Sequence, residues 1–290
     1  MASAKRSKQD WAESFINIAS IAASRGLAFA YITLAHGPAP PPDALHHARA
    51  AAERAVRLDS TLAEGWAALA DIRTYLTWEW EGAEEAFDRA NALNPSMAMN
   101  HYHRAWYLAL FGRAEEAIAS HERARELDPL TPLHTVWMPG LYYYLGMKER
   151  ALKEARVVAQ RYPDNATALY TLGLAAAELG EYDEAITAHR RAAAINPRWK
   201  GALGRSYAVA GRTNEAHAIV AELEAEPTSW NAYAVAEIHT ALGNFDEAFR
   251  WLAFEPAHGW LPWTRISPTF APLRTDQRFE DLMRRLNFVL

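Results

Sequence analysis

Apolar and small side chains recur along the chain at spacings that place them on one face of a helix. Small residues seven positions apart, such as Ala117 and Ala124, lie two helical turns apart and therefore share a face. Near the end of the chain, larger side chains follow the same rule at spacings of three, four and seven: Phe279, Leu282, Met283 and Leu286. The pattern predicts an all-α protein with close contacts between helices at the small residues.

The helices are predicted to form antiparallel pairs joined by short turns. The pattern gives these helix ranges: 10–34, 43–58, 62–76, 81–93, 197–210, 213–225, 229–242 and 245–253. A glycine follows the first helix in five of the pairs, where a left-handed C-terminal cap suits glycine: Gly112, Gly146, Gly180, Gly211 and Gly243. Beyond Glu255, four prolines predict irregular chain before a last helix over 276–286.

The pairs repeat at a fixed period. Pro95, Pro129, Pro163 and Pro197 each lie 34 residues after the one before, and similar residues flank them. His121 and His189 occupy the same position in the second helix of their repeats, which favours a packing role for both. A fixed period of this length is typical of solenoids, in which each unit packs only on its neighbours.

The residues within the period resemble the tetratricopeptide repeat. In the unit over 165–197, the characteristic positions hold Leu169, Leu172, Gly173, Leu179, Gly180, Tyr182, Ala185, Ala192 and Pro197. The resemblance implies an all-α, right-handed superhelix (α-solenoid) of about seven helix pairs with a C-terminal capping helix. The chain then divides into a flexible tail (1–9), a repeat array (10–255), and an irregular segment with the capping helix (256–290).

A second resemblance rests on departures from the generic repeat. These are the Trp-x-Trp turn at Trp78 and Trp80, the proline-rich loop over 36–42, and the tail over 259–286. They resemble the C-terminal repeat regions of bacterial multidomain signalling proteins, which follow winged-helix, nucleotide-cyclase or protein-kinase domains. The repeats begin too early in this sequence to leave room for such a domain. We expect a free-standing relative, favoured by Met1 and a plausible first helix, or a sensory and docking piece of a longer protein.

Composition and charge argue against nucleic acid and membranes as partners. The net charge is −5 and the 30 basic residues are spread along the chain, so no basic face favours nucleic acid. A membrane span over 15–35 would carry Arg25 near its middle, which is unfavourable, and Asp10 and Glu13 interrupt a signal-peptide pattern. The absence of cysteine excludes disulfides and thiol chemistry. We expect a cytoplasmic protein that binds neither nucleic acid nor membrane.

The sequence lacks the residue patterns expected of a metal site or a catalytic site. The densest histidine pairs, His46–His47 and His101–His103, lack the three- or four-residue spacing of two ligands on one helix. Paired glutamates such as Glu115–Glu116 stand at the starts of second helices, where they complement the helix dipole. A glycine-rich phosphate loop and a nucleophile elbow are both missing. We therefore expect no enzymatic activity, no cofactor and no metal.

The predicted binding site is the concave groove lined by the first helix of each pair. The residues expected to face it are Tyr75, Tyr102, Trp106, Tyr143, Tyr144, Tyr170, Leu174, Arg198, Arg205, Tyr233 and Glu237. Tyrosine and tryptophan are enriched at binding hot spots because they offer a large contact area with a polar group. The alternative is that these aromatics pack between helices, since a predicted register can slip by one residue. The groove also lacks the Lys and Asn set of carboxylate-clamp repeats, which disfavours a chaperone-tail adaptor.

The leading hypothesis is an interaction scaffold that binds a partner peptide or helix in this groove. A second hypothesis is self-assembly through Trp260, Trp263 and Phe270 in the atypical tail. A third is ligand sensing, in which Arg198 and Arg205, seven apart on one helix face, receive an acidic group. The competing interpretation of the two arginines is a solvated basic edge.

Overall fold

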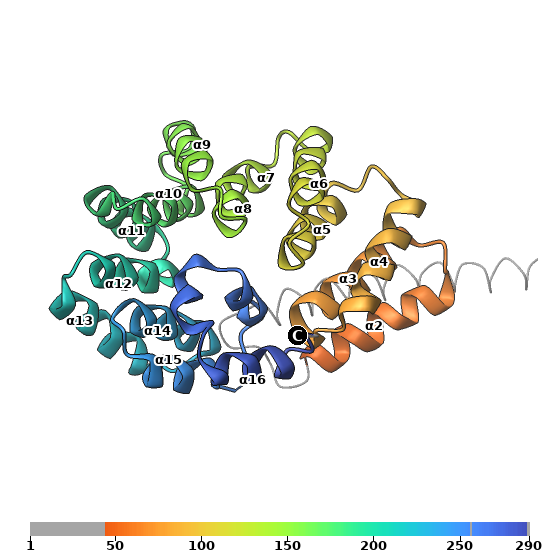
Figure 1. The fold of residues 1–290 in the computed structure, drawn as a ribbon. Coiled ribbons are helices and arrows are strands. Elements are labelled where there is room, and N and C mark those ends of the chain that lie inside the picture. Colours follow the sequence, from red (N-terminus) through yellow and green to blue (C-terminus); the bar gives the residue numbers. More distant parts are fainter. Residues whose placement is uncertain (1–43, 256, 289–290) are drawn as a thin grey trace, which may run out of the picture. The chain divides into compact units, whose positions relative to one another are not determined.

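The computed structural model describes residues 44–255 and 257–288. The chain divides between Asn100 and His101 into two compact units, and each is described by itself. We call the described residues up to Asn100 unit 1 and those from His101 onward unit 2 (Figure 1). The predicted tail over 1–9, the helix over 10–34 and the loop over 36–42 lie outside the described residues.

Unit 1 contains α2 (Ala44–Leu58), α3 (Ala63–Ile72), the π-helix η1 (Arg73–Thr77) and α4 (Trp80–Leu93). These bounds agree closely with the predicted helices. The Trp-x-Trp turn lies between η1 and α4. Trp78 takes a left-handed conformation with φ of 56° there, which ends the helix and lets α4 begin two residues later.

Charged side chains support this turn. The Arg73 guanidinium donates a 2.7 Å hydrogen bond to the carbonyl oxygen of Gly82, joining η1 to the first turn of α4. Arg49 in α2 donates to the Glu79 carboxylate at 2.7 Å. The Trp-x-Trp insertion therefore extends α3 by one wide turn, η1. Hydrogen bonds to α2 and α4 fix the end of this turn.

Unit 2 continues the paired helices and then adds a different terminal region. Its paired helices are α5 (Ala98–Leu110, which begins just before the unit boundary), α6 (Ala114–Leu127), α7 (Pro132–Val136), α8 (Met138–Tyr144), α9 (Lys148–Arg161), α10 (Ala166–Glu178), α11 (Tyr182–Ile195), α12 (Lys200–Val209), α13 (Thr213–Glu224), α14 (Ser229–Ala241) and α15 (Phe245–Leu252). The 3-10 helix η2 (Pro197–Trp199) leads into α12. No strand occurs among the residues described, so the predicted all-α solenoid is confirmed.

Small residues and glycines give the pairs their geometry. Ala117 and Ala124 of α6 and Ala185 and Ala192 of α11 are fully buried, so the predicted close-contact positions are confirmed. The five glycines predicted to end first helices all have left-handed φ angles, between 72° and 80°. Each allows a sharp reversal into the second helix that a side chain would strain.

The first helix of the third described pair in the chain is broken. It forms the short helices α7 and α8, which meet at Trp137. Pro139, the second residue of α8, has no backbone N–H with which to continue the hydrogen bonds of α7. The break places the Trp137 side chain at the start of α8.

The chain beyond α15 returns across the inside of the arc formed by α5 to α15 (Figure 1). It contains the 3-10 helices η3 (Leu261–Arg265) and η4 (Pro268–Leu273), followed by α16 (Gln277–Arg285). We call residues 257–274 the return segment. This segment belongs to the same compact unit as α6 to α15.

α16 covers α15, as expected of a capping helix. Its predicted apolar face is buried, with exposed fractions of 7% or less for Phe279, Leu282, Met283 and Leu286. Arg278 pairs with Asp246 of α15 at 2.7 Å, and Arg285 donates to the carbonyl oxygen of Leu252 at 2.8 Å. The predicted capping helix is therefore confirmed.

Candidate functional site

The candidate site is the inner face of unit 2, which the return segment covers. We use inner face for the sides of α5, α8, α10, α12 and α14 that lie toward that segment. Most of the predicted groove residues fall on these helices, and the candidate site lies wholly within unit 2. Arg198 lies in η2, just before α12. Tyr75 belongs to unit 1, where it is buried within η1.

Trp260 of the return segment lies among the aromatic side chains of four helices or helix junctions. Its ring centroid is 5.2 Å from that of Trp137, 6.3 Å from Trp106 and 6.4 Å from both Tyr144 and Trp230. Such tilted and edge-to-face arrangements are the favoured geometries for aromatic pairs. The inner face therefore holds one side chain of the segment in an aromatic pocket.

Thr269 makes the polar contact between the segment and the inner face. Its hydroxyl oxygen is 2.9 Å from the Tyr143 hydroxyl and accepts a hydrogen bond from Arg205 Nη1 at 2.9 Å. Next to it, the Phe270 ring packs edge-on against Tyr233, with 5.5 Å between centroids. One short sequence therefore contacts three helices: α8, α12 and α14.

The middle of the return segment is fixed to α5. Arg265 Nη1 donates to the carbonyl oxygen of Leu110 at 2.6 Å, at the last residue of that helix. The Arg265 guanidinium also lies over the rings of Phe111 and Phe288, 5.6 Å and 4.7 Å from their centroids. The segment thus connects opposite ends of the arc within unit 2.

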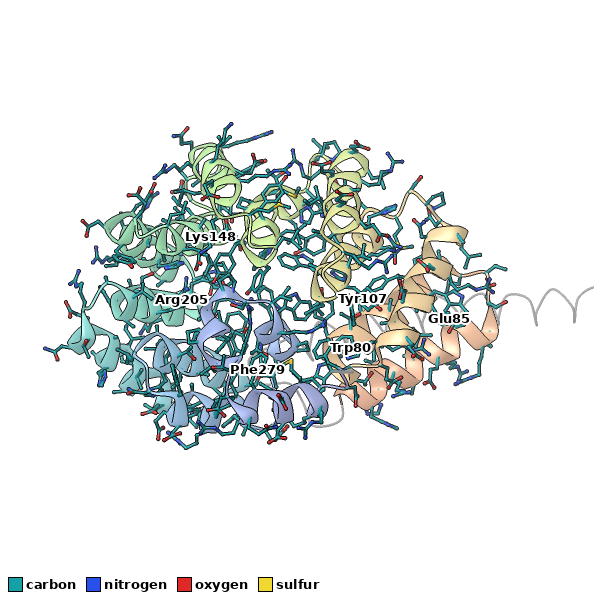
Figure 2. All side chains as sticks on the ribbon, in the orientation of Figure 1. Trp80, Glu85, Tyr107, Lys148, Arg205 and Phe279 are labelled. Carbon is teal, nitrogen blue, oxygen red and sulfur yellow. The ribbon has the colours of Figure 1, made fainter. Side chains whose placement is uncertain are left out.

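Arg205 is a buried cation on the inner face, only 3% exposed (Figure 2). Its Nε and Nη2 atoms have no hydrogen-bond partner among the described residues. Burial opposes its charge, but the nearby Tyr143, Glu237 and Tyr170 outweigh burial and raise the pKa of Arg205. The guanidinium therefore remains charged while only one of its nitrogens donates a hydrogen bond to the segment.

Glu237 of α14 is the buried acid on the same face, 8% exposed. Burial raises its pKa to about 7, while the charge of Arg205 acts in the opposite direction. It lines a pocket of about 20 Å³ together with Tyr170, Trp199 and Trp230. That volume holds roughly one water molecule, so the pocket is nearly filled by its own lining.

Arg198 lies at the rim of this pocket. Its guanidinium stands over the Trp230 ring at 3.9 Å and the Trp199 ring at 5.2 Å, and its carbonyl oxygen accepts a 2.7 Å hydrogen bond from Trp230 Nε1. The rings of Tyr170 and Trp199 stack at 3.8 Å. The stacked rings form an apolar wall, and the arginine covers it on the exposed side.

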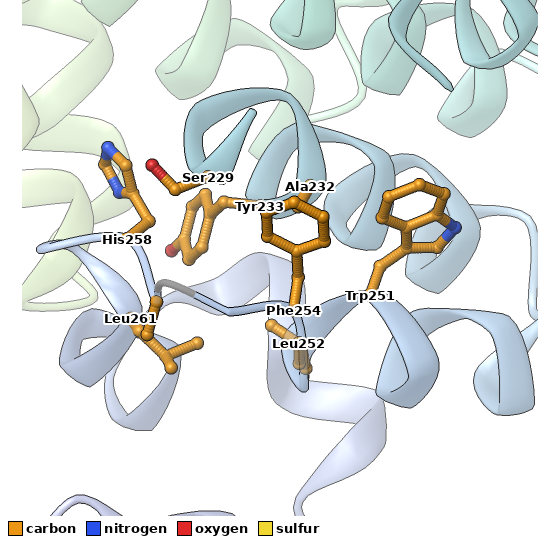
Figure 3. A pocket seen from close by; sticks show the side chains of 9 residues that line it. Ser229, Ala232, Tyr233, Trp251, Leu252, Phe254, His258 and Leu261 are labelled. Carbon is orange, nitrogen blue, oxygen red and sulfur yellow. The ribbon is translucent and has the colours of Figure 1, made fainter. Parts of the chain in front are cut away.

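Tyr233 joins the inner face to the start of the return segment. Figure 3 shows its side chain between His258 and Leu261 on one side and Phe254 on the other. The Tyr233 and His258 rings are 5.7 Å apart. The Tyr233 hydroxyl has no hydrogen-bond partner among the residues that the structure describes, although it is buried.

One predicted groove residue, Tyr102, lies in the core between helices. Tyr102 contacts the rings of His121 and His134 at 5.4 Å and 5.3 Å, which places it among α5, α6 and α7. Leu174 is 2% exposed within α10. The packing alternative raised for the aromatic series therefore describes Tyr102, because His134 of α7 packs against its ring.

The structure also places several residues on the site that the sequence prediction left out. They are Trp137, Trp199, Trp230 and Thr269. A signal existed for two of them, because Trp199 and Trp230 follow Pro197 and Pro227 by two and three residues. Trp199 ends η2, just before α12, and Trp230 lies in the first turn of α14. Thr269 has no such signal, since only the tertiary fold brings it to Tyr143.

The proposed self-assembly surface needs correction. Trp263 is 2% exposed and Phe270 is fully buried, both within unit 2. Only Trp260 of the three aromatics is partly accessible, and it is surrounded by inner-face rings. Because folding buries these side chains inside their own unit, they do not form an exposed apolar patch for a second copy.

Two further features concern the described helices and side chains. None of these helices is long and apolar enough to cross a membrane. No group of three or more His, Cys, Asp or Glu residues in the described ranges is arranged to hold a metal ion.

Two stretches of the chain, together less than half of its length, match a known repeat family. A family model described as the tetratricopeptide repeat matches residues 79–132 and 141–198. A search of curated proteins found no match.

Several solved structures have a similar fold. A tetratricopeptide repeat protein from Parabacteroides merdae superposes with a TM-score of 0.56 at 14% identity, covering 93% of this chain and 99% of that one. Pseudomonas aeruginosa pilF gives 0.54 at 17% identity, covering 72% and 92% of the two chains. A chain of the APC/C hetero-tetramer Cut9–Hcn1 gives 0.54 at 16% identity, covering 85% of this chain and 49% of that one. At these identities the likeness concerns the fold alone.

Proposed function

We propose that this chain, a tetratricopeptide-repeat protein, is an adaptor that binds an extended segment of a partner protein on the inner face of unit 2. The partner segment would take the place of the return segment. The proposal joins two features of the molecule: a repeat fold suited to peptide recognition, and an aromatic face already engaged by a peptide-like stretch of chain.

The observation that carries the proposal is the way the return segment lies on this face. It has the character of a bound peptide: short 3-10 turns, a tryptophan in an aromatic pocket and a threonine hydrogen-bonded to the Tyr143 and Arg205 side chains. Aromatic anchors in pockets surrounded by polar contacts are typical of binding hot spots. The chemistry that holds this segment is available to another segment that supplies similar anchors.

Competition with the return segment gives the proposal its test. The return segment is tethered to the chain, so it competes for the inner face at a high effective concentration. A partner in solution can bind only to the fraction of molecules in which the segment has left that face. Weakening the contacts of Trp260 and Thr269 without altering the inner face should therefore increase partner binding. This choice avoids substituting Tyr143 or Tyr170, whose burial would make their loss a folding defect.

The experiment is quantitative affinity capture from the native host. Wild type is compared with the Trp260→Ala/Thr269→Ala variant, and a synthetic peptide of residues 257–274 is added as competitor. We expect the variant to retain several-fold more of the same partner and the peptide to displace it. Tyr182→Ala, which removes an exposed aromatic from α11 outside the inner face, is the matched control.

The proposal fails if the captured proteins are the same for wild type and variant and resist the competitor peptide. A partner bound elsewhere on the solenoid would give that result. Because Trp263 and Phe270 are buried within unit 2, they give no support to self-assembly through an exposed apolar surface. A cytoplasmic location and a link to multidomain signalling proteins stay predictions from sequence.

A further inference from the structure

We propose that the partner segment places an aspartate or glutamate carboxylate against Arg205, where the return segment places the hydroxyl of Thr269. This inference rests on the proposed function and adds the chemistry of the ligand at one position. On this inference, the return segment binds the site less tightly than an acidic peptide would.

The first argument is the hydrogen bonding of Arg205. A guanidinium has five N–H donors in a planar fork that matches the two oxygens of a carboxylate. Here it donates to the single oxygen of Thr269, and its Nε and Nη2 atoms have no partner among the described residues although the side chain is 3% exposed. Leaving buried donors of a charged group unsatisfied is unfavourable. A carboxylate at the same place would accept from two nitrogens.

The second argument is that the surrounding groups are also donors. The Tyr143 hydroxyl lies 2.9 Å from the Thr269 oxygen and can donate to a carboxylate in its place. The Tyr233 ring packs against Phe270, the residue after Thr269, and its buried hydroxyl has no partner within the described chain. Glu237 is the acid on this part of the face. Its raised pKa of about 7 lets it take up a proton when a second carboxylate arrives.

The third argument is the charge of the return segment itself. Residues 257–274 contain Arg265 and Arg274 but no aspartate or glutamate. The segment therefore brings positive charge to a face that already holds Arg205 and Arg198. An acidic segment of similar apolar character would bind with better charge complementarity and could displace it.

A cationic ligand is the competing chemistry, because aromatic walls and Glu237 also suit a cation. Two observations weigh against it. The Trp199 and Trp230 rings of the Glu237 pocket are already covered by the Arg198 guanidinium, a cation that the chain itself supplies. Arg205 would in addition repel it.

The decisive test uses the full chain without any partner. Thr269→Asp places the carboxylate in the return segment, and Thr269→Asn serves as the neutral control of equal size. A charge-assisted hydrogen bond to Arg205 should raise the Tm of Thr269→Asp above that of Thr269→Asn by about 5 °C. In an Arg205→Gln background this difference should vanish, and Arg205→Lys, which keeps the charge but not the fork, should keep only part of it.

The inference is overturned if Thr269→Asp is no more stable than Thr269→Asn in the wild-type background. It is equally overturned if the difference is the same with and without Arg205. Should Arg205→Gln fail to fold, Tyr143→Phe is the second background. It removes one of the two donors and should reduce the stabilising effect of Thr269→Asp.

A binding measurement separates this inference from the proposed function. Fluorescein-labelled peptides of residues 257–274 with Asp, Asn or Lys at position 269 are titrated into the full chain carrying Trp260→Ala. We expect the Asp peptide to bind about tenfold more tightly than the Asn peptide, whereas tighter binding of the Lys peptide contradicts the inference. If a partner is captured but the Asp and Asn peptides bind alike, only the inference fails. If the Asp peptide binds more tightly but no host protein is captured, only the proposed function fails.

Discussion

At the residue scale, the buried histidines show how single side chains join neighbouring helices. The Nε2 atom of His189 lies 3.0 Å from the carbonyl oxygen of Tyr170, and its Nδ1 atom lies 2.7 Å from the Ser206 hydroxyl. Because a carbonyl only accepts, Nε2 carries the proton and Nδ1 accepts from the hydroxyl. His189 therefore connects α10, α11 and α12 as a neutral side chain, which confirms the packing role predicted from its repeat position.

Gly173 is the residue that makes room for this histidine. A Cβ atom added at Gly173 would lie 2.4 Å from the His189 ring, closer than any real contact. We predict that Gly173→Ala destabilises the fold by about 1–2 kcal/mol, the strain of overpacking less the better helix propensity of alanine. Urea unfolding measures this change.

The same substitution in a His189→Ala background provides the control. With the ring removed, the added methyl group has space, so Gly173→Ala should be neutral or stabilising there. An equal loss of stability in both backgrounds would show that the glycine is needed for another reason.

At the element scale, α16 depends on one apolar face and on good helix ends. The Asp276 side chain caps its N-terminus by accepting from the backbone N–H of Arg278 at 2.9 Å, and Arg284 and Arg285 stand in its last turn, where they complement the helix dipole. The helix has nine residues, too few to be stable alone, so packing on α15 decides whether it forms.

Leu282 tests this dependence. We predict that Leu282→Ala lowers the free energy of unfolding by about 2–4 kcal/mol, because it leaves a cavity in the buried face of α16. Asp281→Ala, one residue away on the exposed face, should change stability by less than about 1 kcal/mol, the usual contribution of an exposed ion pair. Equal effects of both variants in thermal unfolding would contradict the assigned face.

At the scale of the whole molecule, the buried ionisable groups make the free energy of unfolding depend on pH. The histidines and Glu237 act in opposite directions. Burial lowers the pKa of His121 and of His189 to about 3, from 6.5 for the free side chain. The folded chain then binds fewer protons than the unfolded chain between pH 3 and 6.5, so stability rises with pH over that range. Glu237, with its pKa raised from 4.5 to about 7, has the opposite effect between those two values.

Glu237→Gln isolates the acidic contribution. Glutamine resembles the neutral acid, so we predict that the variant equals wild type at about pH 3.5, below the ordinary glutamate pKa of 4.5, and is more stable at pH 8. The gain should approach about 3 kcal/mol for a shift of this size. Chemical unfolding at several pH values measures the difference, and a gain that stayed constant with pH would contradict the prediction. Glu181→Gln, at an exposed position of the turn before α11, is the control, for which we expect little change in free energy.

The repeat architecture could be predicted from the sequence because it depends on local residue patterns. Proline spacing, the glycines after first helices and the buried small residues each depend on a few neighbouring positions and recur at each repeat. Their predicted roles agree with the structure at Gly112, Ala117 and His189, among others. The break at Trp137 and the packing of Tyr102 against His121 and His134 are details of single helical turns, which periodicity does not resolve.

The sequence by itself determined the helices, their pairing and the aromatic character of the first helices, since each follows from the spacing of apolar, small and turn-forming residues. Only the tertiary structure decided what lies on the inner face of unit 2. Thr269 meets Tyr143 across 126 residues of chain, and Arg265 reaches Leu110 across 155. The return segment has no periodicity of its own. Its position is set by where Trp260 and Phe270 can be buried and where Thr269 and Arg205 can meet, which depends on the curvature of the completed arc.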